Sequence, residues 1–574
     1  MSCKFISELR RLSKLSAEAV QNLDSFDSLK KYLHVVRNTE ADFKHLLVAI
    51  SGITHKQLVL VCGSAGDGKS HLLSHMKHND PEGLLADYVI INDATESNAP
   101  RETATQTLAG RIAAFRDDRL NDGGCEKVVL AINLGMLNNF IDSEEGKAFQ
   151  ALRNYVLNNK IFSVAEALPF DKNGIFQHID FSDYQLYTLT EAGAKSDYLK
   201  ELFSRIFAAD SSNSFYVAYV NSASCPHHAH CPVRHNFELL MNQAVQEQLI
   251  QRIIEVCIKD KLIVTSRDVL NFIFDAIASP DFDDKNFWKT ISNPVKFLES
   301  YIAYTTPMLM FENNGTSELI DRMTVHSAKS ESVEVRDNAV LSFYAADDIT
   351  ETVKGVLGNS KYADMLLQYD LSTIDNARDD LKKYVYKFLM HYQKIADPAT
   401  LSSDTVYTNF VKDLFHSYAG NRASLKELYK AVHHSIYAWD GTYGNDLICI
   451  DDSNDDYCIL EKLSIESDVL PGTGEPEIFQ FTPSITVRFK DEAETGRVRL
   501  SIDFSLYKLI MAMRDGYCPT SQDRNIHADF ASGVKALAEL GSQRTRVIIV
   551  SKRKSSTSRY MFKETDFGYS FKEV

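Results

Sequence analysis

Short apolar runs alternate with helical stripes of hydrophobic residues through the first part of the chain. The runs have the length and β-branched character of buried strands, and they lie at 57–62, 88–92, 128–132 and within 177–189. The helical stripes between them lie at 102–120 and 149–157. Strands that alternate with helices are typical of a mostly parallel sheet covered on both faces. We therefore predict an α/β, doubly wound core.

The same pattern divides the 574 residues into five parts, because so long a chain exceeds what one hydrophobic core can hold. Helical stripes precede the first strand and prevail after residue 237, a proline at 280 stops one helix, and strands return after 441. The predicted parts are an N-terminal helical segment (1–50), the core (51–236), a helical lid (237–280), a mainly helical region (281–440) and an α+β domain (441–574).

The loop after the first strand has the sequence of a phosphate-binding P-loop. Its residues Gly63, Ser64, Ala65, Gly66, Asp67, Gly68, Lys69 and Ser70 match G-x-x-x-x-G-K-[ST], between a strand and a helix. The glycines allow a tight turn whose N–H groups point at phosphate oxygens, and the helix N-terminus adds partial positive charge. Lys69 then reaches the β- and γ-phosphates, and Ser70 holds Mg²⁺. We predict ATP and Mg²⁺ as ligands; the alternative is a chance match in a glycine-containing loop.

A P-loop ATPase also needs an acidic residue after an apolar strand to position Mg²⁺ and water. Asp93 follows one strand only 24 residues after Lys69, and a role as a helix cap or turn residue is equally open. Asn133 follows the next strand, 64 residues after Lys69, but its side chain is not acidic. We predict Asp93 as a second Mg²⁺ ligand and Asn133 as a sensor of the γ-phosphate. Without an acid in place, hydrolysis should be slow or absent.

Arg267 stands at the start of an apolar-striped helix that follows the core, with Thr265 or Ser266 as its cap. An arginine in a first turn is disfavoured by the helix dipole, so another contact is expected to hold it there. We predict that Arg267 reports the state of the γ-phosphate from a helical lid. The alternative is a surface arginine.

The segment 225–235 packs two cysteines and four histidines into eleven residues. Thiolate and imidazole groups are the usual ligands of Zn²⁺. A closed site could use Cys225, Cys231 and two of the histidines, although the spacing is not that of a zinc finger. A loop with a buried cysteine pair is the alternative.

Composition narrows the class of protein. A net charge of −16 argues against a surface that coats DNA broadly. Nine scattered cysteines are typical of the reducing cytoplasm, and the chain has neither a signal-peptide pattern nor an apolar run of about 18 residues. We therefore expect a cytoplasmic protein without a membrane span. The C-terminal segment 543–563 is locally basic with interleaved aromatic residues, so it is either a DNA-backbone contact or a solvated edge hairpin.

Several segments together resemble the DptF family, the P-loop component of the DNA phosphorothioation-dependent restriction system. The resemblance covers nearly the whole chain, and its later segments are more particular than the P-loop. Those segments are GSAGDGKSHLL, INDATES, APRETATQTLAGRI, VVLAINLGMLNNF, IDFSDYQLY, the Cys-Pro…Cys-Pro-Val loop, TPMLMFE, SELIDRM, HHSIYAWDG and DFSLYKLIMAMRDGYCP.

The resemblance implies a role in defence against DNA that lacks the phosphorothioate mark, together with DptG-like and DptH-like partners. It carries over only the phosphate loop 63–70, whereas Asp93, Asn133 and Arg267 are assigned by their place in the predicted fold. Those assignments favour an AAA+-like P-loop NTPase core with a lid. No nuclease pattern is present, so we expect no cutting by this chain. The alternatives are a nucleotide-binding scaffold without hydrolysis and, less favoured, a kinase.

Overall fold

The computed structural model describes residues 3–13, 28–64, 66–92, 102–162, 171–312, 317–326, 334–346, 348–369, 379–398, 404–441, 447–451, 454, 456–491, 496–552, 559–565 and 568–573. The chain forms two compact units. Unit 1 comprises Met1–Tyr187, Lys195–Cys257 and Leu262–Ser403, and unit 2 comprises Thr188–Ala194, Ile258–Lys261 and Asp404–Val574.

Unit 1 contains a four-stranded, all-parallel sheet in the order β2-β3-β1-β4. The strands are β1 (Gln57–Gly63), β2 (Tyr88–Ile91), β3 (Lys127–Asn133) and β4 (Phe176–Asp180). Every residue of β1 is buried, as expected of a central strand covered on both faces. The structure therefore confirms the predicted mixed α/β class and the parallel sheet.

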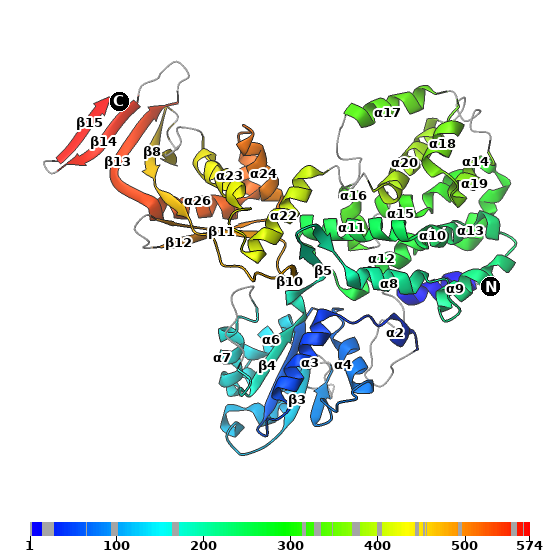
Figure 1. The fold of residues 1–574 in the computed structure, drawn as a ribbon, viewed down its shortest axis with the longest axis horizontal. Coiled ribbons are helices and arrows are strands. Elements are labelled where there is room, and N and C mark those ends of the chain that lie inside the picture. Colours follow the sequence, from blue (N-terminus) through cyan, green and yellow to red (C-terminus); the bar gives the residue numbers. More distant parts are fainter. Residues whose placement is uncertain are drawn as a thin grey trace. The chain divides into compact units, whose positions relative to one another are not determined.

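Helices cover both faces of this sheet (Figure 1). Alternate residues of β1 enter two separate hydrophobic clusters, one on each face. One cluster contains side chains of α3 (Asn38–Ile50) and α4 (Lys69–His78). The other contains side chains of α5 (Ala104–Arg111), α6 (Leu134–Ile141) and α7 (Gln150–Asn158). This two-sided cover is the doubly wound arrangement that the sequence predicts.

The neighbouring strands β1 and β3 are followed by helices on opposite faces of the sheet. Helix α4 follows β1 on one face, and α6 follows β3 on the other. Such a change of face opens a crevice at the carboxyl ends of the two strands, where α/β proteins bind ligands. Gly63 and Asn133 end these strands in register with each other. The crevice therefore opens at the predicted P-loop.

Two predicted helices differ in extent. The helix predicted at 102–120 ends at Arg111 and continues as two 3₁₀ turns, Ala113–Phe115 and Asp117–Arg119. The helical pattern at 237–259 contains a break, because the side chain of Asn242 accepts a hydrogen bond from the Ala244 N–H (2.9 Å) and starts a new helix.

The other helices of unit 1 form a mainly helical part of this unit, to one side of the sheet (Figure 1). They are α1 (Lys4–Leu9), α2 (Ser28–Leu33), α8 (Asp197–Phe207), α9 (Ser214–Asn221), α10 (Pro232–Leu240), α11 (Gln243–Lys259), α12 (Ser266–Ile277), α13 (Asp284–Lys289), α14 (Pro294–Ala303), α15 (Thr306–Phe311), α16 (Glu318–Val325), α17 (Glu334–Ala345), α18 (Thr350–Leu357), α19 (Lys361–Leu366) and α20 (Asp379–Ala396).

Unit 2 is α+β. Its helices are α22 (Thr405–Ala419), α23 (Lys426–Ala438), α24 (Phe504–Arg514), α25 (Ser521–Ile526) and α26 (Ala528–Gly541). Its strands are β7 (Leu447–Asp451), β8 (Tyr457–Leu463), β9 (Ile465–Ser467), β10 (Glu477–Gln480), β11 (Ile485–Asp491), β12 (Arg497–Ile502), β13 (Ser542–Ser551), β14 (Arg559–Thr565) and β15 (Gly568–Glu573). The sheets run β15-β14-β13-β8-β7, β12-β11-β9 and β10-β5-β6, where β5 is Tyr184–Thr190 and β6 is Gly193–Lys195.

The compact C-terminal unit begins earlier than the domain predicted at 441–574. Helices α22 and α23 belong to it, since Tyr507 of α24 donates to Asp413 of α22 (2.7 Å) and Tyr437 of α23 donates to the Leu463 carbonyl (2.8 Å). Two helices that the sequence assigns to the middle region thus pack with the C-terminal strands. Helical periodicity alone cannot show which core a helix joins.

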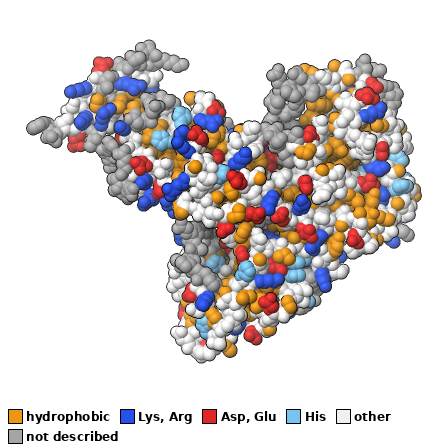
Figure 2. Space-filling model, viewed as in Figure 1, with side chains coloured by type: hydrophobic (Ala, Val, Ile, Leu, Met, Phe, Trp, Pro, Cys, Tyr) orange, Lys and Arg blue, Asp and Glu red, His pale blue; other side chains and the backbone are white. Residues whose placement is uncertain are grey.

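No helix in the described ranges has both the length and the apolar composition needed to cross a membrane. Figure 2 shows basic and acidic side chains interspersed on the visible face of the described residues. Neither sign of charge forms a continuous cover on that face, in keeping with the expectation that the chain does not coat DNA broadly.

Candidate functional site

The predicted P-loop connects β1 to α4 at the carboxyl edge of the sheet. Three of its glycines have positive φ angles: Gly63 at 146°, Gly66 at 93° and Gly68 at 96°. Such angles are ordinary for glycine and strained for other residues. Gly68 is the N-cap of α4, which begins at Lys69, so the loop leads directly into a helix N-terminus. Ala65 lies outside the described residues.

Gly63 is also held by close packing. A Cβ atom at this position would lie 2.7 Å from Asp67 Oδ2 and 2.9 Å from Phe181 Cβ. Neither neighbour is a free surface group, because Asp67 and Phe181 are both buried. The absence of a side chain at Gly63 therefore lets the loop close against the end of β4.

Internal hydrogen bonds fix the loop. The buried Asp67 carboxylate accepts a hydrogen bond from the Ser64 N–H. The Lys69 ammonium lies over the loop and donates to the Ser64 carbonyl at 2.6 Å. A phosphate held in the loop would therefore lie within reach of the Lys69 ammonium.

Arg37 supports the loop from outside, and the sequence analysis did not identify it. Its guanidinium donates to the Asp67 carbonyl (2.8 Å) and lies over the rings of Phe181 (5.4 Å) and Tyr198 (5.6 Å). Burial lowers the pKa of Arg37, but an arginine remains charged at neutral pH. Arg37 precedes α3 within the segment predicted to be helical, and hydrophobic periodicity does not single out a charged residue.

The structure places Asn133 directly beside the P-loop. It pairs in register with Gly63, and its Oδ1 accepts the Met136 N–H at 2.6 Å, which caps α6. The position of Asn133 is compatible with its predicted role as a sensor of the γ-phosphate, because it lies at the end of the strand next to β1. Because the carbonyl oxygen caps the helix, the amide nitrogen is the group that can address a phosphate.

The second predicted acid cannot be placed. Asp93 lies outside the described residues, as does the neighbouring Glu96. The strand before it, β2, is separated from β1 by β3, which sets the end of β2 about 10 Å from β1. The role of Asp93 as a Mg²⁺ ligand therefore stays a prediction.

Two acids that the sequence analysis did not select follow the other neighbour of β1. Asp180 ends β4, pairs with Cys62 and is buried, and Asp183 follows three residues later. Burial raises the pKa of Asp180 and of Asp67, and the nearby Lys69 ammonium opposes both shifts. The sequence does show an acidic residue, Asp180, at the end of an apolar strand. It does not show that this strand lies next to β1, because strand order is a tertiary feature.

The desolvating surroundings and the charge of Asp180 raise the pKa of Asp183 to about 6. The folded state therefore favours the protonated carboxyl, and this contribution to stability is lost as the pH rises from about 4 through 6. We expect Asp183→Asn to gain thermal stability relative to the wild type over this interval and to keep a constant difference above it. Melting curves between pH 4.5 and pH 8 measure this, with Asp87→Asn at an exposed position as the control. Parallel curves for wild type and Asp183→Asn would contradict it.

Helix α12 reaches the P-loop with its N-terminus. Thr265 caps it, and a capping box joins Thr265 to Asp268, which confirms the predicted cap. Thr265 Oγ1 lies 3.1 Å and Arg267 Cβ 3.6 Å from the place where a Cβ of Gly66 would stand. Arg267 therefore lies at the loop, which is where a residue that senses bound nucleotide has to be.

A cavity of about 150 Å³ adjoins the loop on the side of α12. Its polar lining includes the loop glycines 66 and 68, Arg37 and Arg267, together with His34, Glu40, Asp67 and His71. Leucine and aromatic side chains form much of the remaining wall: Leu29, Leu33, Phe181, Tyr198, Leu202 and Leu270. A cavity that combines apolar walls with converging polar groups is the usual form of a small-molecule site.

The cysteine and histidine loop does not assemble the predicted zinc ligands. Within the described ranges, neither Cys225 nor Cys231 belongs to a group of three metal-ligating side chains. His227 stacks on Trp288 (centroids 4.4 Å apart), and burial raises the pKa of Cys231 to about 12. The thiol of Cys231 is therefore protonated at neutral pH without a metal, and Zn²⁺ at this loop stays a prediction.

The basic C-terminal segment forms strands β13 and β14, which pair as the predicted hairpin. Strand β15 covers β14, so the edge strand is β15 and not β14. Tyr560 and Phe562 alternate with Arg559 and Lys563, and alternate residues of a strand face opposite sides. The aromatic and basic side chains therefore do not share one face, unlike those of a groove that stacks bases and follows a phosphate backbone. DNA contact here stays a prediction.

Comparisons of the chain with protein-family models, with curated proteins and with solved structures found no match. The resemblance to the DptF family thus stays a prediction from the quoted segments. The functional assignment of the site therefore depends on its geometry alone.

Proposed function

We propose that this chain binds Mg²⁺·ATP at the carboxyl edge of its parallel sheet. The observation that carries the proposal is the conformation of residues 63–69. A buried strand ends in a glycine loop with positive φ angles, and the loop leads into a helix whose first residue is Lys69. Backbone N–H groups, helix dipole and ammonium group then converge on one anion site.

Mg²⁺ fits the electrostatics of this edge. Asp67 and Asp180 are buried within the field of Lys69, and Asp183 follows Asp180. Carboxylate groups near the phosphate loop favour the magnesium complex over the bare triphosphate, because the complex carries less negative charge, and Arg37 and Arg267 add positive charge to the same edge. The hydroxyl of Ser70 is the predicted Mg²⁺ ligand.

The adjoining cavity offers room for the nucleoside. Its aromatic and leucine side chains suit a nucleobase, and it lies directly beside the loop glycines 66 and 68. The phosphates would occupy the loop, and the base would enter the cavity next to Arg37 and α12. One nucleotide can thereby contact the loop, the segment before β1 and the lid helix at the same time.

Arg267 and Asn133 are proposed to read the γ-phosphate from two directions. Arg267 approaches from α12, and Asn133 from the strand next to β1. This supports an AAA+-like core with a lid, in which nucleotide state moves a helix. Arg267→Ala is expected to change ATP affinity only a few-fold and to lower turnover by at least about ten-fold. Steady-state ATPase assays measure this, with Arg322→Ala on an exposed helix as control; equal turnover in both variants would exclude the sensing role.

We further propose that the chain acts as the nucleotide-binding subunit of a phosphorothioation-dependent restriction complex. The support is the set of segments that resemble the DptF family, spread over both compact units. DptG-like and DptH-like proteins would be its partners. This chain would contact DNA either directly or through these partners. Cutting is assigned to a partner.

A second candidate is a nucleotide-binding switch or scaffold that does not hydrolyse ATP. One observation favours it: β3, one of the two strands beside β1, ends in Asn133 and not in an acid, and the carbonyl oxygen of this side chain is engaged in capping α6. In this case ATP would hold α12 and the loop together, and release of the nucleotide would free them.

One experiment separates the two candidates. Purified chain, alone and with the DptG-like and DptH-like proteins, is assayed for ATP binding and turnover with unmodified and with phosphorothioated DNA. Turnover that DNA stimulates and Lys69→Ala abolishes supports the hydrolysing subunit. Tight binding without turnover above background supports the switch. Absence of ATP binding in the wild type rejects both.

A further inference from the structure

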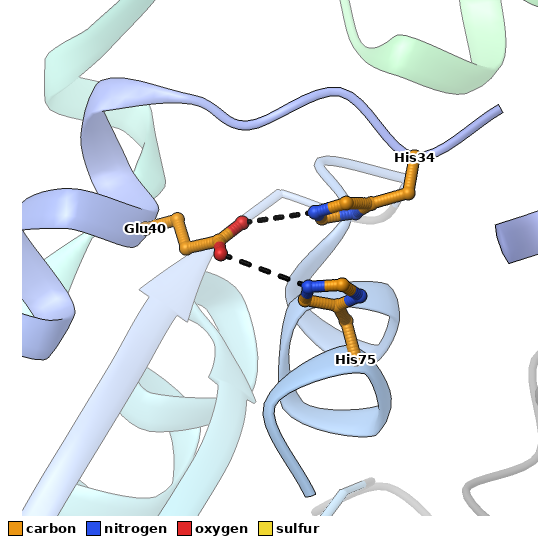
Figure 3. Close-up of side chains that lie close together, drawn as sticks. All are labelled: His34, Glu40 and His75. Atoms are coloured by element: carbon orange, nitrogen blue, oxygen red, sulfur yellow. Dashed lines mark ion pairs between the residues drawn. The ribbon is translucent and has the colours of Figure 1, made fainter. Parts of the chain in front are cut away.

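A cluster of three histidines and Glu40 lies at the P-loop helix, and His34, His71 and Glu40 also line the cavity described above. His34 precedes α3, Glu40 stands in the first turn of α3, and His71 and His75 lie one turn apart on α4 (Figure 3). The Glu40 side chain is only 3% exposed. His71 and His75 share the i, i+4 spacing that places two side chains on one helix face.

The ligand atoms of three of these side chains converge. His34 Nε2 lies 3.3 Å from Glu40 Oε2, and His75 Nε2 lies 3.9 Å from Glu40 Oε1. All the ligand atoms lie within 4.8 Å of one another, and the described ranges hold no other such group. Ligands about 2.0–2.2 Å from Zn²⁺ stand about 3.3–3.5 Å apart at a tetrahedral site. The His34–Glu40 separation fits a tetrahedral site, whereas the wider separations, up to 4.8 Å, require His75 to move closer.

A second contact orients His34. Its Nδ1 lies 2.9 Å from His71 Nε2, a hydrogen bond between the rings. When Nδ1 carries the proton, Nε2 turns a lone pair toward the Glu40 carboxylate. Among the described residues, the buried atoms His34 Nε2 and Glu40 Oε1 have no hydrogen-bond partner. In this tautomer His34 Nε2 and the nearest carboxylate oxygen, Glu40 Oε2, are both acceptors at 3.3 Å, and a cation between them would satisfy both.

The stacking of the rings disfavours a second proton, and the ring of His75 must turn before the two histidines can share an ion. His34 and His75 are stacked, with centroids 3.5 Å and planes 15° apart. Two protonated rings stacked so closely would repel each other. The His75 side chain is 18% exposed and can turn to share an ion with His34. Lys44 reaches Glu40 Oε1 at 3.3 Å, but it is 48% exposed and can withdraw to water.

We propose that His34, Glu40 and His75 form a binding site for a divalent transition-metal ion of the zinc type. Two imidazole nitrogens and one carboxylate oxygen are a donor set that Zn²⁺ prefers, and three protein ligands leave one position open. The ion would tie the segment 34–40, which carries Arg37, to the helix that begins with Lys69. Because His34 and Glu40 also line the cavity proposed for the nucleobase, the test below is made without nucleotide, so that its outcome does not depend on ATP binding or hydrolysis.

The test uses the untagged full chain, stripped of metal by a chelator and titrated with Zn²⁺ in a calorimeter. We expect one equivalent of Zn²⁺ to bind, and His75→Ala and Glu40→Gln each to weaken it by more than about ten-fold. His78→Ala, in the last turn of the same helix, and Cys225→Ser with Cys231→Ser should leave it unchanged. Co²⁺ in place of Zn²⁺ should give a visible spectrum of nitrogen and oxygen ligands without thiolate charge transfer.

Three results would overturn the proposal: binding that survives His75→Ala and Glu40→Gln, binding that disappears with the two cysteines, or no Zn²⁺ binding in the wild type. Circular dichroism and the melting temperature of Glu40→Gln, which keeps the shape of the side chain, separate loss of a ligand from loss of the fold.

Discussion

Lys69→Ala is expected to weaken ATP binding by about 100-fold or more while the chain remains folded. The Lys69 ammonium lies over the loop and contacts the Ser64 carbonyl at 2.6 Å, so it is placed to meet phosphate oxygens without a large rearrangement. Hydrogen bonds between charged groups contribute about 1.5–3 kcal/mol each, and two of them account for a change of this size. Isothermal titration with Mg²⁺ and a non-hydrolysable ATP analogue measures it.

Lys77→Ala provides the matched control, because Lys77 lies in the last turn of the same helix, away from the loop. It removes the same charge and the same side chain from α4. If both variants lost affinity equally, overall charge and not the loop would account for binding. Unchanged affinity in Lys69→Ala would remove the P-loop from the proposed site.

Gly63→Ala is expected to destabilise unit 1 by about 2–6 kcal/mol and to abolish ATP binding. The added Cβ would stand 2.7 Å from Asp67 Oδ2 and 2.9 Å from Phe181 Cβ, and the φ angle of 146° strains any residue but glycine. Overpacking costs about 1–3 kcal/mol and backbone strain a further 1–3 kcal/mol. A lower melting temperature and the loss of the titration signal together measure the effect.

Gly52→Ala is the control for Gly63→Ala. Nothing lies within 4 Å of a Cβ at Gly52. We expect its melting temperature to stay close to that of the wild type. If Gly63→Ala had the same melting temperature as the wild type, the close packing around Gly63 would be contradicted.

The sequence predicts the local parts of the site well, because each is set by neighbours along the chain. The P-loop glycines, the Thr265 cap and the strand that ends at Asn133 all follow from short-range patterns. Apolar strands separated by helical stripes also predict the parallel sheet. These features need no knowledge of which elements meet in space.

The missed residues depend on tertiary adjacency. Asp180 matters because β4 lies beside β1, and Arg37 because its loop crosses the phosphate loop. No periodicity encodes either contact. For the same reason the pattern placed α22 and α23 in the middle region, although hydrogen bonds from Tyr507 to Asp413 and from Tyr437 to the Leu463 carbonyl join them to unit 2.

We expect a single nucleotide to contact both the P-loop and the N-terminus of α12, and this contact is central to the proposed function. Hydrogen–deuterium exchange of the full chain, with and without Mg²⁺ and a non-hydrolysable ATP analogue, tests it most directly. We predict slower exchange in peptides covering 63–70 and 265–270, and no such protection in Lys69→Ala. Protection of neither peptide in the wild type, or protection confined to another part of the chain, would contradict the claim.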